Sequence, residues 1–192
     1  MVSAITNFLT SPTLTNIAQS TTSSVSIETG MKAVGRPSFI LADKQLSSQT
    51  KRYAATKEFL YQATCLATYM LLVIPIFKKG AFKLAKNHIF KNEKAFQQFK
   101  SADQYLNYRK IAGMYEKTNR IKALEESKFK DTFSKELKES LASDAPEKFN
   151  LLKGVIEFGN IVGSVLGLAI LAPEVSHLIV HPTMKALGID KK

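Results

Sequence analysis

The sequence predicts an all-α fold with two transmembrane helices, packed as an antiparallel hairpin, and a basic helical domain between them. Residues 59–77 and 155–173 are apolar stretches of 19 residues each. That length is close to the roughly 20 residues that a helix needs to cross a ~30 Å hydrocarbon core. The segment between them is rich in Lys and Arg and carries apolar residues at helical spacing. The chain has 192 residues and a formal net charge of +11.

Residues 1–48 are expected to form a disordered, Ser/Thr-rich N-terminus and an irregular connector. The first charged side chain is Glu28, and the preceding residues offer too little apolar surface to offset the entropy of ordering them. Gly35 and Pro37 interrupt the connector. The segment lacks the basic start and the continuous apolar core of a signal peptide, so we do not expect secretion.

Residues 49–79 predict a first long helix that contains the span 59–77. Ser47 or Ser48 can cap it, and Pro75 is interpreted as its terminator. The mean hydropathy of the span is in the range typical of transmembrane helices. An alternative is the buried helix of a soluble bundle, because polar residues such as Gln62 weaken the span.

Residues 80–143 predict a basic amphipathic helical region. The segment from Lys78 to Lys153 holds 18 Lys and Arg against 10 Asp and Glu. Its apolar residues recur every three to five positions, which indicates two helices packed as a hairpin. Gly113 or the Thr118–Asn119 pair would form the turn between them.

Residues 144–173 predict a second long helix with the span 155–173. Asp144 can cap its first turn, followed by Pro146 and Glu147. Pro173 is interpreted as its terminator. Residues 174–192 are then expected to form a short helical tail, interrupted near Pro182.

Gly159, Gly163 and Gly167 are the most informative local pattern, because they are spaced four residues apart on one face of the second span. In lipid, such small residues let two helix backbones approach closely. We expect this face to pack against small residues of the first span, Ala63 and Ala67. The alternative is that the glycine face joins two chains into a homo-oligomer.

Lys78, Lys79, Lys83 and Lys86 follow the first span directly and suit the anionic headgroups of a lipid bilayer. No nucleic acid partner is expected, because acidic residues are spread through the same region and no recognition motif is present. The balance of basic residues around the spans favours a cytoplasmic middle region, with both ends of the chain on the other side.

No catalytic signature, cofactor motif or metal site is predicted. Glu174, His177 and His181 are at helical spacing, but Pro182 disturbs their turn and no fourth ligand is evident. The single cysteine, Cys65, lies in an apolar run where its thiol would be inert.

These features predict a non-enzymatic, multi-pass membrane protein, placed in a bacterial inner membrane, that acts as an anchor or scaffold for a basic helical domain. The protein partner is not identified by the sequence. The alternative function is a soluble helical bundle that binds an acidic protein or nucleic acid through its basic surface.

Overall fold

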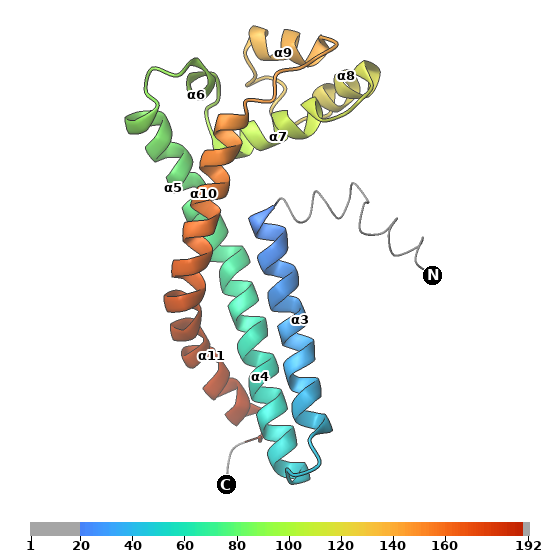
Figure 1. Cartoon of the computed structure of the whole chain (residues 1–192), viewed down its shortest axis with the longest axis vertical. Helices are drawn as coiled ribbons and strands as arrows, with labels where there is room; N and C mark the ends of the chain where they lie inside the picture. The colour runs from blue at the N-terminus through green and yellow to red at the C-terminus, as the bar shows by residue number, and fades with distance from the viewer. Residues whose placement is uncertain (1–19, 190–192) are drawn as a thin grey trace. The chain divides into compact units, whose positions relative to one another are not determined.

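The computed structural model describes residues 20–189, which fold into helices joined by turns and loops (Figure 1). The expected all-α class is confirmed for this part of the chain. The two long helices, Ser48–Ile89 and Asn150–Ala186, are long and apolar enough to cross a membrane. They contain the two predicted spans.

The chain divides into two compact units, which we call the terminal unit (Met1–Ile76 with Asn160–Lys192) and the middle unit (Phe77–Gly159). The terminal unit contains α3 (Thr21–Ala42), α4 (Ser48–Thr68), η1 (Tyr69–Val73), η3 (Gly167–Leu171) and α11 (Ala172–Ala186). The middle unit contains η2 (Ala85–Ile89), α6 (Lys94–Gln98), α7 (Ala102–Ala112), α8 (Lys117–Glu125) and α9 (Lys135–Ala142). Helices α5 (Ile74–Leu84) and α10 (Asn150–Leu166) contribute residues to both units.

Helix α3 corrects the prediction of disorder and an irregular connector, which was wrong for Thr21–Ala42. The Ser20 hydroxyl caps the helix by accepting from the Ser23 amide at 3.3 Å. The helix buries small residues at helical spacing, including Thr29, Ala33 and Pro37, and it packs along α4. Tertiary packing on this face compensates for the low helix propensity that the sequence suggested. The first 19 residues lie outside the described part of the chain.

Helix α4 begins where the sequence predicted, because the Ser47 hydroxyl accepts from the Thr50 amide at 3.2 Å. Helices α4 and α11 pack side by side and run antiparallel. Cys65 lies beside Ser176, with Sγ and Oγ 3.5 Å apart. Further along α4, Val73 lies against Gly167. Successive contacts therefore advance along one helix and go back along the other, as in an antiparallel pair.

The prolines of the two spans do not terminate their helices, which corrects the interpretation of Pro75 and Pro173. Each proline follows a π-helical segment by two residues, η1 before Pro75 and η3 before Pro173. A proline cannot donate to the carbonyl four residues earlier, and its ring crowds that carbonyl. Local widening to π geometry re-satisfies the backbone there, so each helix continues past its proline.

Pro37 and Pro182 also lie inside helices, α3 and α11, and neither breaks its helix as the sequence predicted. The next residue is hydroxylated in both cases. The Ser38 hydroxyl donates to the Val34 carbonyl, and the Thr183 hydroxyl donates to the Ile179 carbonyl, each at 2.7 Å. Each hydroxyl donates to a backbone carbonyl that lies one residue beyond the carbonyl to which the proline cannot donate.

The middle unit is built around an aromatic core. Phe99 packs edge-on against Tyr105, Tyr108 and Phe149, with ring centroids 5.3–5.4 Å apart. The predicted turn at Gly113 is confirmed, because Gly113 caps the end of α7. The predicted hairpin of two helices is instead four short ones, α6 to α9, since the chain bends repeatedly to bring its aromatic residues into this core.

The predicted helix start at Asp144 is wrong, because α10 begins at Asn150. Tertiary hydrogen bonds hold the preceding residues in another conformation. The Tyr105 hydroxyl donates to the Phe149 carbonyl at 3.0 Å, and the Arg120 guanidinium donates to the Ser143 carbonyl. Phe149 adopts a positive φ of 45°, and its ring is buried in the core. Burying this ring outweighs the local capping signal.

Candidate functional site

The two units differ in how they bury their large apolar side chains. The middle unit encloses an aromatic core, with the rings of Phe96, Phe99, Tyr105 and Tyr108 fully buried. Its exposed large side chains are Leu84, Ile89, Tyr115, Ile121, Leu151 and Phe158. In the terminal unit many large apolar side chains are exposed. Those on the two long helices are Phe59, Met70, Leu71, Leu72, Ile76, Ile161, Val165, Leu166, Ile170, Leu171, Leu178 and Ile179. Only 28% and 33% of the most apolar stretch of each long helix is buried.

The interior of the terminal unit consists largely of small residues, several of which are polar. Its buried residues include Thr29, Ala33, Ala55, Gln62, Cys65, Thr68, Gly163, Gly167, Ala172 and Ser176. A few larger side chains, such as Tyr69 and Val73, complete the packing. The unit therefore shows apolar side chains outward and packs its helices through small ones.

The predicted glycine face is buried, and it packs within the chain. In the terminal unit, a Cβ built on Gly167 would overlap the Val73 side chain. In the middle unit, a Cβ built on Gly159 would overlap the Ala81 methyl and lie 3.1 Å from the Phe77 carbonyl oxygen. Gly163 is also buried. Both described contacts require the absence of a side chain, as expected for close helix packing.

The predicted partners of the glycines are corrected. Ala67 is exposed and Ala63 is only half-buried, whereas Val73, Ala81 and Phe77 provide the atoms closest to Gly167 and Gly159. The small-residue pattern identified the correct helix but not the correct residues of it. Cys65 contacts Ser176 and Val73 contacts Gly167, so in the antiparallel pair Ala63 and Ala67 lie beside residues that follow the glycines.

Charged residues of α3 and α4 are joined in ion pairs. The Arg36 guanidinium contacts the Glu58 carboxylate at 3.1 Å, and Glu58 also accepts from the Gln62 amide at 2.9 Å. Glu28 and Lys32 pair with each other one turn apart on α3. Pairing lowers the cost of placing charges in a medium less polar than water.

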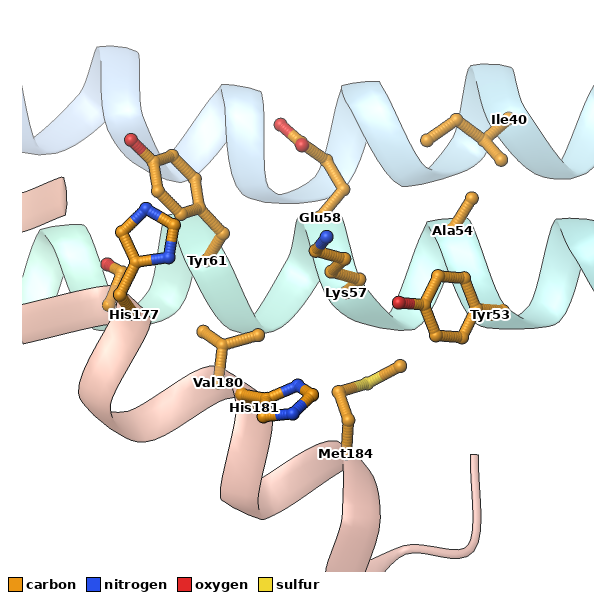
Figure 2. Close-up of a pocket in the computed structure, with 11 residues that line it drawn as sticks. Ile40, Tyr53, Ala54, Lys57, Glu58, Tyr61, His177, Val180, His181 and Met184 are labelled. Atoms are coloured by element: carbon orange, nitrogen blue, oxygen red, sulfur yellow. The ribbon is translucent and has the colours of Figure 1, made fainter. Parts of the chain in front are cut away.

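A groove of about 630 Å³ opens among α3, α4 and α11 in the terminal unit (Figure 2). Helix α4 contributes a polar wall, which includes Tyr53, Lys57, Glu58 and Tyr61. The opposite wall comes from α11, and Ile40 of α3 closes one edge. The α11 residues are Ser176, His177, Val180, His181 and Met184. The sequence did not predict this groove, because its residues come from three separate segments.

The groove brings His177 and His181 together with Tyr61 and Lys57, but not with Glu174. Among residues 20–189, no group of three His, Cys, Asp or Glu lies close enough to hold a metal ion. Cys65 is buried and faces Ser176. The groove can therefore offer hydrogen-bond donors and a cation to an anion, beside the apolar side chains of Ile40, Val180 and Met184.

The four predicted headgroup lysines do not share one environment. Lys78 forms an ion pair with Asp103 at 2.8 Å, and Lys86 donates to the Phe99 carbonyl at 2.7 Å. The hydrogen bond from Lys78 is the main cause that lowers the pKa of Asp103 below its usual 3.8. Lys79 and Lys83 are exposed. Two of the four lysines thus hold the middle unit together, and two remain open to a partner.

Comparison with known protein families, curated proteins and solved structures finds no match to this chain.

Proposed function

We propose that this protein is a non-enzymatic integral membrane protein, in which the terminal unit is the membrane anchor and the middle unit is a basic domain held at the lipid surface. The observation that carries the proposal is that the middle unit encloses an aromatic core, whereas the long helices of the terminal unit expose twelve large apolar side chains. The middle unit has the interior of a water-soluble domain. The terminal unit has the exterior expected of helices in lipid.

Energetics favour lipid over water around the terminal unit. Burying a Leu or Ile side chain stabilises by about 1.5–3 kcal/mol relative to full exposure. Twelve large apolar side chains of the two long helices are partly or largely exposed in this unit. Transfer of that surface to hydrocarbon is therefore worth on the order of 10 kcal/mol. A soluble bundle would instead bury both helices in its core.

The interior of the terminal unit supports the same proposal. Helices in lipid gain little from apolar contact with each other, so they associate through small residues and hydrogen bonds. Gly167, Ala172 and Ser176 provide such a surface on one helix, and Ala55, Cys65 and Thr68 provide it on the other.

A fractionation experiment tests the proposal. The full chain is expressed, membranes are collected and washed at alkaline pH, and pellet and supernatant are blotted. We expect the protein to stay in the pellet until detergent is added. Release into the alkaline wash would contradict the proposal and favour the soluble bundle with an acidic partner.

Charge substitutions on the exposed face make the test sharper. Leu71 and Ile170 are 72% and 59% exposed. Replacing both by Arg in a soluble protein would change little, because both side chains would face water. In a membrane helix each Arg costs about 2.5–3.5 kcal/mol on insertion. We expect the Leu71→Arg, Ile170→Arg protein to lose membrane retention, while the control Leu84→Arg, in the middle unit, keeps it.

The orientation that we propose places the middle unit in the cytoplasm of a bacterium and the protein in the inner membrane. Basic residues within about 15 positions of the span ends support that side. They are Lys78, Lys79, Lys83, Lys86, Lys91, Lys148 and Lys153 on the middle side, against Lys44, Lys51, Arg52, Lys57 and Lys185 on the other. Because Cys65 is the only cysteine and is buried, an exposed Lys110→Cys would be the accessible thiol. A membrane-impermeant maleimide should label it only after the cells are opened. Labelling in intact cells would contradict this orientation and place the middle unit on the outer side of the membrane.

A further inference from the structure

We propose that the groove among α3, α4 and α11 binds the phosphate headgroup of an anionic phospholipid, with Lys57, His177 and His181 as the phosphate-binding residues. This inference rests on the proposed membrane function. The site differs from the lysines that follow the first span, because its residues come from three helices of the terminal unit (Figure 2).

The position of the groove along the helices fits a headgroup. The expected spans end at residues 59 and 173 on this side. Because Cys65 contacts Ser176 in the antiparallel pair, residue 59 lies at about the level of residue 182. With a rise of about 1.5 Å per residue, the two span ends are about 13 Å apart along the helices. His177 and His181 lie between these two levels and Lys57 lies about 3 Å beyond residue 59, so the groove occupies the boundary region in which the two spans end.

The charge of the groove fits an anion. Its one lining carboxylate, Glu58, is compensated by Arg36 at 3.1 Å and accepts from Gln62. Among residues 20–189, Lys57 takes part in no ion pair and lies 6.0 Å from the centre of the Tyr53 ring. The ammonium of Lys57 is therefore available, together with the Tyr53 hydroxyl and the exposed imidazoles.

The surroundings of the groove favour a lipid over a free phosphate. Ile40, Val180 and Met184 give the groove an apolar wall. Exposed apolar side chains continue outside it, with Phe39 on α3 and Leu178 on α11, which are 80% and 76% exposed. A phosphate with attached acyl chains can contact both surfaces, whereas inorganic phosphate can use only the polar wall.

Native mass spectrometry of the full chain in detergent tests the site. Equal amounts of phosphatidylglycerol and phosphatidylcholine are added, and the ratio of the two bound lipids is measured. One Lys near a lipid surface contributes a factor of about five in affinity for an anionic lipid. We expect Lys57→Gln to lower the phosphatidylglycerol preference about fivefold, and Lys57→Gln with His181→Gln to lower it further.

A matched control separates the groove from general charge. Lys44→Gln removes the same charge from the exposed turn between α3 and α4, outside the groove, and should leave the lipid preference unchanged. Ala54 of α4 also lines the groove, so Ala54→Leu fills it and should weaken the binding of both lipids there. Equal loss of preference in the two lysine variants, or no loss in either, would overturn the proposed site.

The remaining outcomes identify which proposal fails. If glycerol phosphate displaces the bound phosphatidylglycerol, the groove binds a soluble phosphate and the lipid assignment is wrong. If lipids stay bound but Lys57→Gln has no effect, the groove proposal fails and the membrane function stands. If the chain is recovered in the alkaline wash without detergent, the membrane function itself fails.

Discussion

Gly167 illustrates how single residues control the packing of the terminal unit. A Cβ at this position would overlap the side chain of Val73 on the opposing helix. Space for even one methyl group is missing, so the two helices must separate or their side chains must leave favourable rotamers. Overpacking of this kind costs about 1–3 kcal/mol.

We therefore predict that Gly167→Ala destabilises the protein by about 1–3 kcal/mol, measured as a lower thermal unfolding midpoint in detergent. Gly35→Ala is the matched control, because a Cβ on Gly35, in α3, would have no neighbour within 4 Å. Replacing a helical Gly by Ala without a clash stabilises by up to about 1 kcal/mol. Equal effects of the two substitutions would contradict the close packing at Gly167.

Asp103 gives a prediction on pH dependence in the middle unit. The folded protein lowers the pKa of this carboxyl below its usual 3.8, chiefly through the hydrogen bond from Lys78. A lowered pKa means that the ionised form is stabilised by folding. This contribution is present above about pH 4 and is lost as the pH falls through the folded pKa.

We predict that Asp103→Asn lowers the thermal unfolding midpoint at about pH 7, and that the difference from the wild type shrinks as the pH falls from about 4 to about 2. The effect is modest because the Asp103 side chain is 41% exposed and solvent screens the pair. A difference of the same size at both pH values would show that Asp103 acts through its shape and not through its charge.

At the scale of the elements, the antiparallel contact of α4 with α11 is the arrangement to test directly. The Cys65 sulfur lies 3.5 Å from the Ser176 hydroxyl oxygen, and both residues are buried. A disulfide needs its two sulfur atoms about 2.05 Å apart, which small side-chain movements can provide from this separation.

We predict that Ser176→Cys forms an intramolecular disulfide with Cys65 on mild oxidation, detected as a loss of free thiols and a cross-linked peptide pair by mass spectrometry. Leu178→Cys is the control, because Leu178 lies on the same helix but is 76% exposed. It should keep both thiols free. Cross-linking of Leu178→Cys in preference to Ser176→Cys would mean that α11 presents a different face to α4.

The sequence predicted some elements well and others poorly, for physical reasons that differ between them. The two apolar helices, the cap at Ser47 and the turn at Gly113 follow from local patterns, and these predictions were confirmed. Helix α3 was missed because Ser/Thr richness and Pro37 suggested disorder. Its signal was the small-residue spacing of Thr29, Ala33 and Pro37, which has meaning only when a partner helix is present.

The proline positions were misjudged for a related reason. Local rules assign Pro75 and Pro173 to helix ends, but the structure widens the preceding turn into η1 and η3 and continues. The groove was beyond prediction, since Lys57 and His181 are brought together by the packing of α4 against α11. The lysines after the first span were assigned one role, yet the fold of the middle unit engages Lys78 and Lys86.

At the scale of the whole molecule, the middle unit is the part of the chain with a core of its own. The middle unit encloses its own core, from Phe82 to Ile156. Its two chain ends are adjacent, because a Cβ on Gly159 would lie 3.1 Å from the Phe77 carbonyl oxygen. A segment with a closed core and neighbouring ends has the features of an independently folding domain.

We predict that residues 77–159, expressed alone, form a helical and cooperatively unfolding domain that is soluble without detergent, whereas the full chain requires detergent. The physical reason is that the core of this unit, from Phe82 to Ile156, is formed by residues of the unit itself. Circular dichroism and sedimentation provide the measurement.

Within this fragment, Phe99→Ala should lower the free energy of unfolding by about 3–5 kcal/mol, because it removes a fully buried ring from the aromatic cluster. Exposed Tyr115→Ala, at the other extreme of burial, should change stability by less than about 0.5 kcal/mol. A fragment that aggregates or stays unfolded would mean that the middle unit depends on the spans, and the protein would then be one cooperative body and not an anchor carrying a separable domain.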